Sequence, residues 1–259
     1  KWMTIGKELS HIENARLQDV KNFFFKHYRP VNAILVVAGN VKVEQVRKLA
    51  EKWFGPIEAG QKYSRNLPEE PIQTGPRKLE VEADVPLDAL YKCWHIYPRM
   101  DHRYYVSDLI TEVLSGGGSS RLFQALVKEQ KLFSNIECYH FGTTDSGLLT
   151  IEGKLVKGVK IADAEKAINE ELQKIKEHKI SDAELQKVKN KTESMIAFED
   201  MSVMNRANSL AFYELLGDAS LMNTELDRYN SVTVNEIQEE SNKIFREENS
   251  STLWYLSKN

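Results

Sequence analysis

The segment from Phe23 to Ile57 (FFFKHYRPVNAILVVAGNVKVEQVRKLAEKWFGPI) constrains the fold more than any other part of the chain. Its first residues continue a helical apolar pattern that Pro30 ends, because proline lacks the backbone N–H that another turn would need. Ala33–Gly39 is continuously apolar and rich in β-branched residues, which predicts a strand buried on both faces. An amphipathic helix with a core-facing stripe follows at about Val43–Phe54. The segment therefore predicts a helix–strand–helix unit whose apolar faces must be buried.

A change in composition separates this unit from the rest of the chain. Four of the seven prolines lie between Pro56 and Pro76, together with Gly60 and Gly75. Proline removes backbone donors and stiffens the chain in an extended form, so this stretch is typical of a semi-rigid connection. We therefore expect an incomplete domain at residues 1–58, a linker at 59–77 and a complete domain at 78–259.

The region after the prolines predicts an α+β domain. Strand patterns fall at Lys78–Val85, Leu90–Tyr97, Asn135–Phe141, Leu148–Leu155 and Ser251–Leu256. Helical patterns fall at Tyr105–Leu114 and begin again near Ile161, Ser181, Met204 and Thr233. This order favours a mostly antiparallel sheet with helices packed on one face.

Two details refine the expected helices. Ser181-x-x-Glu184 and Thr233-x-x-Glu236 match the capping box, in which two backbone N–H groups at the start of a helix are satisfied reciprocally. Charges of both signs alternate along Glu165–Lys191, which predicts a solvated helical surface with pairs at i,i+4.

Two blocks of the sequence resemble a known family. The first is Phe23–Ile57, with R-P-x-N before the expected strand and F-G-x-I after the last helix, and the second is Leu114–Tyr139 (LSGGGSSRLFQALVKEQKLFSNIECY). They resemble consecutive domain repeats of the pitrilysin/insulinase family of zinc metallopeptidases, peptidase family M16. The resemblance implies an M16-like (LuxS-like) repeat fold and zinc in the parent protein. It also implies a peptide substrate and a homologous or identical M16-like partner subunit.

The zinc-binding motif of that family is missing from the chain. The motif is an inverted H-x-x-E-H on one helix, with the glutamate as general base. None of the six histidines begins such a motif; the one Glu-His pair is Glu177-His178, and Lys174 occupies the position of the first histidine. The resemblance implies that the ligands lie upstream of a further matching block, Trp2–Gly6. We therefore expect no catalytic residue and no bound metal in this chain, which would be inactive by itself.

A second functional pair of the family is also missing. In the partner half of these enzymes, an arginine and a tyrosine seven residues later bind substrate carbonyls. The matching segment here is Leu126–Ser134, which has Val127 at the arginine position and Ser134 at the tyrosine position. Neither side chain can replace a guanidinium or a phenol. The alternative is that this segment only packs.

The triple glycine Gly116, Gly117 and Gly118 leads into Ser119-Ser120-Arg121. A phosphate-binding loop is excluded, because the G-K-[ST] ending and the preceding parallel strand are absent. The pattern predicts a flexible connection between helices, with Ser119 or Ser120 as N-cap and Arg121 in solvent or in a surface ion pair. The resemblance implies in addition that the three glycines and Ser134 lie on the wall of a substrate chamber.

Cys93-Trp-His95 and Cys138-Tyr-His140 are two C-x-H pairs on expected strands. A spacing of two places the side chains of each pair on one face of a strand. If the two strands were neighbours in register, Cys93, His95, Cys138 and His140 could form a tetrahedral zinc site. The alternative is that these cysteines and histidines belong to the core, which is common in sheets.

Composition narrows the remaining functions. Lys and Arg number 35 against 38 Asp and Glu, so no net positive field favours nucleic acid, and no apolar run approaches the roughly 20 residues of a membrane helix. Two cysteines leave the compartment open, cytoplasmic or periplasmic. Three hypotheses stand: the C-terminal portion of a zinc metallopeptidase acting on short or unfolded peptides, a non-catalytic M16-like partner or scaffold subunit, or a separate α+β binding module whose metal is held by the C-x-H pairs.

Overall fold

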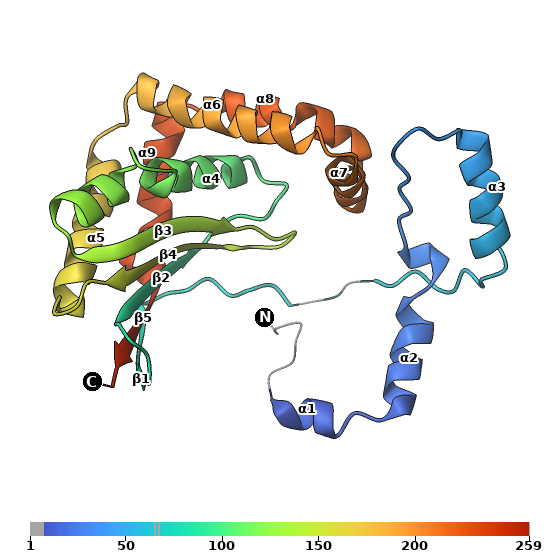
Figure 1. Cartoon of the computed structure of the whole chain (residues 1–259), viewed down its shortest axis with the longest axis horizontal. Coiled ribbons are helices and arrows are strands. Elements are labelled where there is room, and N and C mark those ends of the chain that lie inside the picture. Colours follow the sequence, from blue (N-terminus) through green and yellow to red (C-terminus); the bar gives the residue numbers. More distant parts are fainter. Residues whose placement is uncertain (1–7, 65, 67, 259) are drawn as a thin grey trace. The chain divides into compact units, whose positions relative to one another are not determined.

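The computed structural model describes residues 8–64, 66 and 68–258, and the block Trp2–Gly6 lies outside them. The chain divides into two compact units (Figure 1). One contains Ile72–Ala197 and Asn223–Asn259, and the other contains Lys1–Pro71 and Phe198–Met222. The described residues between Glu58 and Pro76 form neither helix nor strand. Each unit is described by itself.

The first of these units is built on a five-stranded sheet. Its strands are β1 (Arg77–Ala83), β2 (Ala89–His95), β3 (Phe133–Phe141), β4 (Leu148–Leu155) and β5 (Ser250–Ser257). Their order is β1-β5-β2-β4-β3, and only the β1–β5 pair is parallel. The predicted mostly antiparallel sheet is therefore confirmed.

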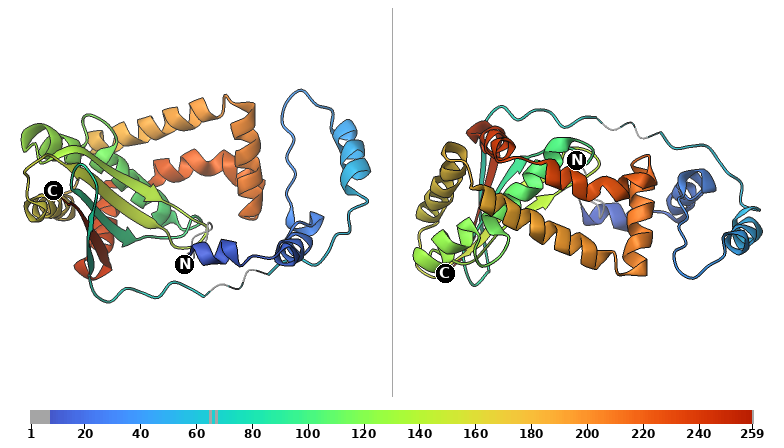
Figure 2. Two further views of the ribbon diagram at one scale, coloured as in Figure 1. Left: turned by 60° about the horizontal axis from the view of Figure 1, so that its bottom comes forward. Right: turned by 90° about the horizontal axis from the view of Figure 1, so that it is seen from above.

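Helices cover one face of this sheet, as Figures 1 and 2 show. The covering helices are α4 (His102–Ser115), α5 (Ile161–Glu177) and α9 (Val234–Ile244). Helix α4 packs on β3, α5 packs on β2, and both helices contact α9. The sheet alternates accordingly: Leu90 and Trp94 of β2 are buried under the helices, whereas Tyr91 and Cys93 on the other face are half-exposed. Because apolar residues at alternate positions face the helices, a single core forms between the two layers.

The expected helix starts are confirmed, with one difference in capping. Thr233 and Glu236 form the complete capping box at the start of α9. At the start of α6 (Asp182–Glu199), Ser181 accepts a hydrogen bond from the Glu184 N–H at 3.1 Å. The Glu184 carboxylate instead binds Arg121, so only half of this predicted box forms.

The prediction of a solvated surface along Glu165–Lys191 is wrong for several of its charges. Lys166 and Glu170 form an exposed i,i+4 pair as expected. Glu165, however, binds Lys92 of the sheet, and Lys189 is buried with its ammonium donating to the carbonyls of Asn230 and Val232 at 2.8 and 2.6 Å. Sequence spacing identifies pairs within a helix, but it does not reveal partners on other elements.

The other unit contains short helices and no sheet in its described residues. It holds α1 (Leu9–Glu13), α2 (Leu17–His27), the 3₁₀ turn η1 (Pro30–Asn32), α3 (Val43–Phe54) and α7 (Val203–Leu215). The predicted strand at Ala33–Gly39 is wrong: this segment is extended but pairs with no strand. A strand is stabilised by hydrogen bonds to a neighbour, and the described part of this unit offers none.

The apolar stripes of α2 and α3 are exposed, contrary to the predicted burial. Trp53 is 65% exposed, Phe23 is 58% exposed, and Leu35 of the extended segment is 57% exposed. The segment after α3 does return to η1: the Tyr63 N–H donates to the Asn32 side chain at 2.9 Å. The helices of this unit are thus formed, but the described chain provides no layer that covers their apolar faces.

Candidate functional site

The glycine loop after α4 needs two of its three glycines. A Cβ at Gly116 would clash with the carbonyl oxygen of Glu112, and Gly117 has φ +121°, a conformation that side chains disfavour. A Cβ at Gly118 would meet nothing within 4 Å. The loop is therefore a tight reversal at the end of α4, and its third glycine is not required by contacts.

One face of α6 holds this loop in place. Glu184, Lys187 and Lys191 lie three and four residues apart, so their side chains share a face of the helix. Glu184 accepts two hydrogen bonds from the Arg121 guanidinium, at 2.9 and 2.7 Å. Lys187 donates to the Ser119 hydroxyl at 3.2 Å, and Lys191 donates to the Gly116 carbonyl at 3.1 Å. These contacts anchor the loop, so we interpret it as a fixed connection and not as the flexible hinge that was predicted.

The three residues after the glycines differ in detail from their expected roles. The Ser120 hydroxyl donates to the Gly117 carbonyl at 2.6 Å, and in the described chain neither it nor Ser119 accepts from a helix N–H as an N-cap would. The expected ion pair of Arg121 is present but partly buried, with side-chain exposures of 25% for Arg121 and 22% for Glu184. Hydrogen bonding from Arg121 holds the pKa of the Glu184 carboxyl below its usual range.

The segment with the missing arginine and tyrosine forms a π-helix, η2 (Phe123–Glu129). Gln130 N–H donates to the carbonyl of Ala125, five residues back, at 2.9 Å. Val127 packs against the core, and Ser134 lies exposed at a bulge in β3, where its hydroxyl donates to the Lys154 carbonyl at 3.0 Å. The structure thus gives both side chains packing and backbone contacts and offers no cationic or phenolic group at these positions.

The two C-x-H pairs are not brought together. Strand β4 lies between β2 and β3, so the condition for a shared site is not met. Through β4, Cys93 is in register with Thr150 and Tyr139, whereas Cys138 is in register with Ile151 and Lys92. Cys93 and His95 therefore lie on the helix-free face, and Cys138 and His140 lie on the helix-covered face. Burial raises the pKa of the thiols of Cys93 and Cys138, which disfavours the thiolates that a metal would need.

His140 takes part in a small polar cluster inside the helix-covered face. Its Nδ1 lies 3.5 Å from Asp108, and its ring lies tilted against that of Tyr104 with the centroids 4.2 Å apart. Its Nε2 is buried without a hydrogen-bond partner among the described residues. Asp108 also accepts from the Tyr229 phenol at 2.6 Å. The cluster joins α4, β3 and the short helix α8 (Glu225–Ser231) and has no set of donors suited to a metal.

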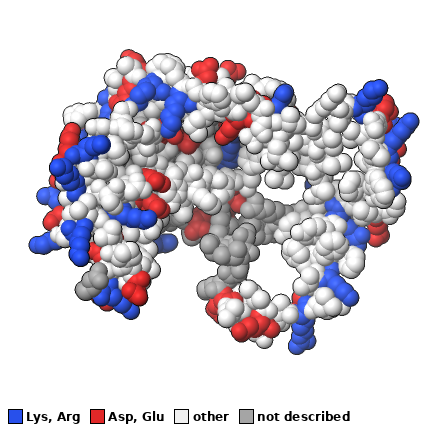
Figure 3. All heavy atoms as spheres, viewed as in Figure 1, with Lys and Arg blue, Asp and Glu red and all other residues white. Residues whose placement is uncertain are grey.

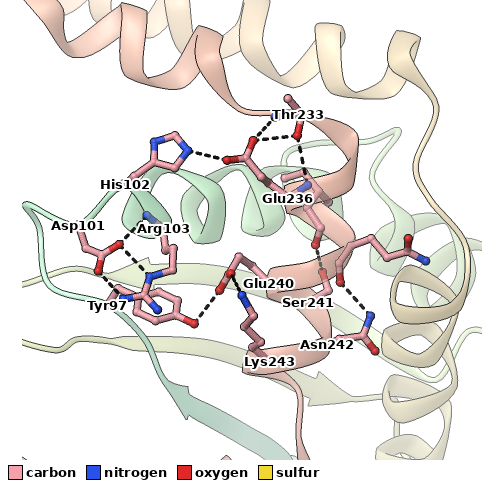
Figure 4. A network of polar contacts seen from close by, with 12 residues as sticks. Tyr97, Asp101, His102, Arg103, Thr233, Glu236, Glu240, Ser241, Asn242 and Lys243 are labelled. Carbon is pink, nitrogen blue, oxygen red and sulfur yellow. Dashed lines mark hydrogen bonds and ion pairs between the residues drawn. The ribbon is translucent and has the colours of Figure 1, made fainter.

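A further polar network connects the start of α4 with α9 (Figure 4). The Tyr97 phenol donates to Glu240 at 2.6 Å, and Lys243 donates to the same carboxylate at 2.6 Å. His102 Nε2 lies 2.9 Å from Glu236 of the capping box. Because these groups point at one another, the network fixes the start of α4 and the preceding Tyr97 to α9.

The helix-free face of the sheet carries the side chains best placed to meet a partner. By register, Leu253, Tyr91 and Glu152 lie in one row across it, and Cys93 and Tyr139 lie in the next. Tyr139 is 39% exposed and donates to Glu152 at 3.1 Å. No group of three or more His, Cys, Asp or Glu side chains that could hold a metal occurs in the part of the chain described. The face can therefore offer shape, aromatic rings and hydrogen bonds.

Comparison with known proteins agrees with this geometry. Residues 14–192 match the family model described as the peptidase M16 inactive domain. The chain therefore belongs to the M16 peptidase family, which confirms the resemblance seen in its sequence.

Several relatives are longer than this chain. It is 26% identical over 257 residues to the zinc protease PqqE of Helicobacter pylori, which covers 98% of the chain and 57% of that protein. The crystal structure of a protease from Helicobacter pylori has a TM-score of 0.88 at 24% identity, covering 96% of this chain and 61% of that one. The peptidase M16 inactive domain from Pseudomonas fluorescens has a TM-score of 0.84 at 15% identity, covering 99% and 60%. The fold is thus shared, while the chain spans a little over half the length of these three proteins.

Proposed function

We propose that this chain is the non-catalytic C-terminal portion of a zinc-dependent metallopeptidase that hydrolyses short or unfolded peptides. The observation that carries the proposal is the match to the M16 inactive domain in a chain whose 259 residues contain no H-x-x-E-H. The zinc ligands and the general base would then belong to a part of the protein outside this chain. Its own residues do not fit a catalytic zinc, because the described histidines and carboxylates form no ligand set.

We also propose the domain limits that the proline-rich stretch predicts. Residues 1–58 would complete a first M16-like domain, 59–77 would link the domains, and 78–259 would be the second domain. The exposed stripes of α2 and α3 and the unpaired segment Ala33–Gly39 support this, since each requires a covering layer. The rest of the first domain would supply a neighbouring strand and a core.

The second domain would form one wall of a closed chamber. Its helix-free sheet face presents half-exposed Tyr91, Leu253 and Tyr255 without catalytic chemistry, which suits a surface that confines a peptide and excludes water. Gly116, Gly117, Gly118 and Ser134 would lie at this wall, and a homologous or identical M16-like subunit would supply the other half. Charges of both signs are interspersed on the face shown in Figure 3, so nothing there favours nucleic acid. No described helix is both long and apolar enough to cross a bilayer.

The test compares three samples on a fluorogenic, unstructured peptide: the 259-residue chain with zinc, the whole protein, and the whole protein with its H-x-x-E-H glutamate changed to glutamine. We expect turnover only by the unmodified whole protein, abolished by a chelator. Val127→Ala in the whole protein should lower stability and leave turnover nearly unchanged. Chelator-sensitive cleavage by the 259-residue chain would overturn the proposal. A whole protein that lacks the motif and binds peptides without cleaving them would favour the scaffold alternative.

A further inference from the structure

A cavity of about 490 Å³ lies in the sheet-bearing unit, on the helix-covered side of the sheet. It is bounded by the start of β1, the middle of β2, one side of α5 and the segment that joins α9 to β5. Cavities of this volume are typical of sites for small ligands. It shares no lining residue with the glycine loop, and none of its lining residues has a role in the proposed peptidase.

The walls of the cavity are positively charged, although the chain as a whole has a net charge of −3. Five cationic side chains line it against two carboxylates: Arg77, Lys78, Lys92, Lys176 and Arg246 against Glu165 and Glu247. A low-dielectric hollow lined by one sign of charge concentrates counter-ions of the other sign. The surplus therefore points to an anionic ligand.

Glu165 is already neutralised by groups of the protein. Lys92 lies 3.0 Å from one of its oxygens, Lys78 lies 3.8 Å from the other, and the Trp254 indole N–H donates to it at 2.9 Å. Burial would raise the pKa of Glu165, but these contacts outweigh burial and hold it below its usual range. Glu165 is thus a fixed, compensated charge, and Glu247 is the other carboxylate of the lining. Arg77, Lys176 and Arg246 form no ion pair with a carboxylate among the described residues, although Arg246 Nε donates to the Lys243 carbonyl at 2.9 Å.

The floor of the cavity combines one free hydroxyl with an apolar surface. Thr252 is 7% exposed and lines the cavity, and its hydroxyl makes no hydrogen bond to the described chain. Trp94 and Phe245 pack edge to face there, with ring centroids 5.0 Å apart, and Leu172 lies on the α5 side. An unpartnered hydroxyl beside aromatic rings and cations suits a ligand with an anionic end and an apolar body.

We propose that this cavity binds a small organic anion, a carboxylate or a phosphate ester, whose charged group meets Lys176 and Arg246 and whose apolar part lies against Trp94 and Phe245. The Thr252 hydroxyl would donate to the ligand or accept from it. The proposal does not depend on the proposed peptidase function, because no zinc chemistry and no chamber residue enters it.

The test measures binding to the 259-residue chain and to the whole protein by calorimetry, with three probes of similar shape. N-acetylphenylalanine represents a peptide carboxyl terminus, phenyl phosphate represents a phosphate ester, and N-acetylphenylalanine amide is the neutral control. We expect one or both anions to bind, more weakly at high salt, and the amide to bind at least tenfold more weakly than N-acetylphenylalanine. The anion that binds more tightly shows whether the natural ligand is a carboxylate or a phosphate ester.

Substitutions at the rim assign the binding to this cavity. Lys176→Gln and Arg246→Gln should each weaken anion binding by roughly tenfold. Lys179→Gln lies just beyond α5 and outside the cavity, so it should leave binding unchanged; thermal unfolding checks that all three variants fold. The proposal is overturned if neither anion binds, if the amide binds as well as the acid, or if Lys179→Gln weakens binding as much as Lys176→Gln.

Discussion

Single residues in this chain act mainly by fixing elements to one another. Arg121 is the clearest example, because its planar guanidinium binds both oxygens of Glu184 from a partly buried position. Such bidentate pairs have a defined geometry that a single exposed lysine–carboxylate contact lacks. Arg121 thereby positions the glycine loop that precedes η2, whose Val127 packs against the core.

Changing Arg121 to methionine should lower the free energy of unfolding by about 1–2 kcal/mol at pH 7. The pKa of Glu184 is lowered in the folded state, so the stabilisation is present above the unfolded pKa of about 4.3 and is lost as pH falls through the lower folded value. Urea unfolding at pH 7 and again below pH 4 should therefore show a difference that shrinks on acidification. Lys166→Met removes an exposed pair and should cost no more than about 0.5 kcal/mol. An equal cost for both variants, or no dependence on pH, would contradict the role given to Arg121.

At the scale of elements, the turn from α4 into η2 is held by side chains of a neighbouring helix. The face of α6 that carries Glu184, Lys187 and Lys191 contacts this turn at three points. The π-helix η2 begins immediately after this turn in the chain. The π-helix therefore begins from a fixed point, and its buried Leu126 enters the core from there.

Alanine substitutions separate the glycines that this turn needs from the one that it does not. Gly117→Ala should destabilise the chain by about 1–2 kcal/mol, because φ +121° is strained for any side chain. Gly118→Ala should change the stability by less than about 0.5 kcal/mol, since the added methyl group meets nothing within 4 Å and φ is ordinary. Denaturant midpoints of the two variants provide the measurement. If Gly118→Ala were the more harmful of the two, the turn geometry described above would be wrong.

For the whole molecule, the main feature is the contrast between the two units. The sheet-bearing unit has a continuous core that includes Leu90, Tyr105 and Ile151. The helices α1, α2 and α3 bury no residue, and α2 and α3 still present amphipathic stripes. Amphipathic helices owe most of their stability to packing, so α2 and α3 should be only marginally stable without a covering layer.

Hydrogen exchange should show this contrast directly. In the 259-residue chain, amides of Leu17–Phe54 should exchange rapidly, whereas those of β4 should be protected. In the whole protein, amides of Leu17–Phe54 should become protected by at least tenfold, because a complete first domain would cover the stripes. Strand β4 serves as the internal control and should not change. Equal exchange of Leu17–Phe54 in the two proteins would argue against the proposed completion of that domain.

The sequence by itself determined the elements and the family. Periodicity identified all five strands of the sheet, Pro30 and Gly55-Pro56 marked the ends of helices, and two quoted blocks carried the M16 resemblance that the family match confirms. These signals are local, because the alternation of side chains along a strand and the spacing along a helix depend only on neighbouring residues. The absence of H-x-x-E-H is equally a property of the sequence alone.

Only the tertiary structure decided which distant residues meet. It separated Cys93 and His95 from Cys138 and His140 by placing β4 between their strands, and it left Ala33–Gly39 unpaired. In the folded chain, the Glu184 carboxylate binds Arg121 and does not complete the predicted capping box. The cationic side chains that line the cavity come from four separate segments. These outcomes depend on strand order and on long-range contacts, which no spacing along the chain encodes. A strand pattern in particular predicts a capacity for pairing, and a partner strand must be present before the hydrogen bonds can form.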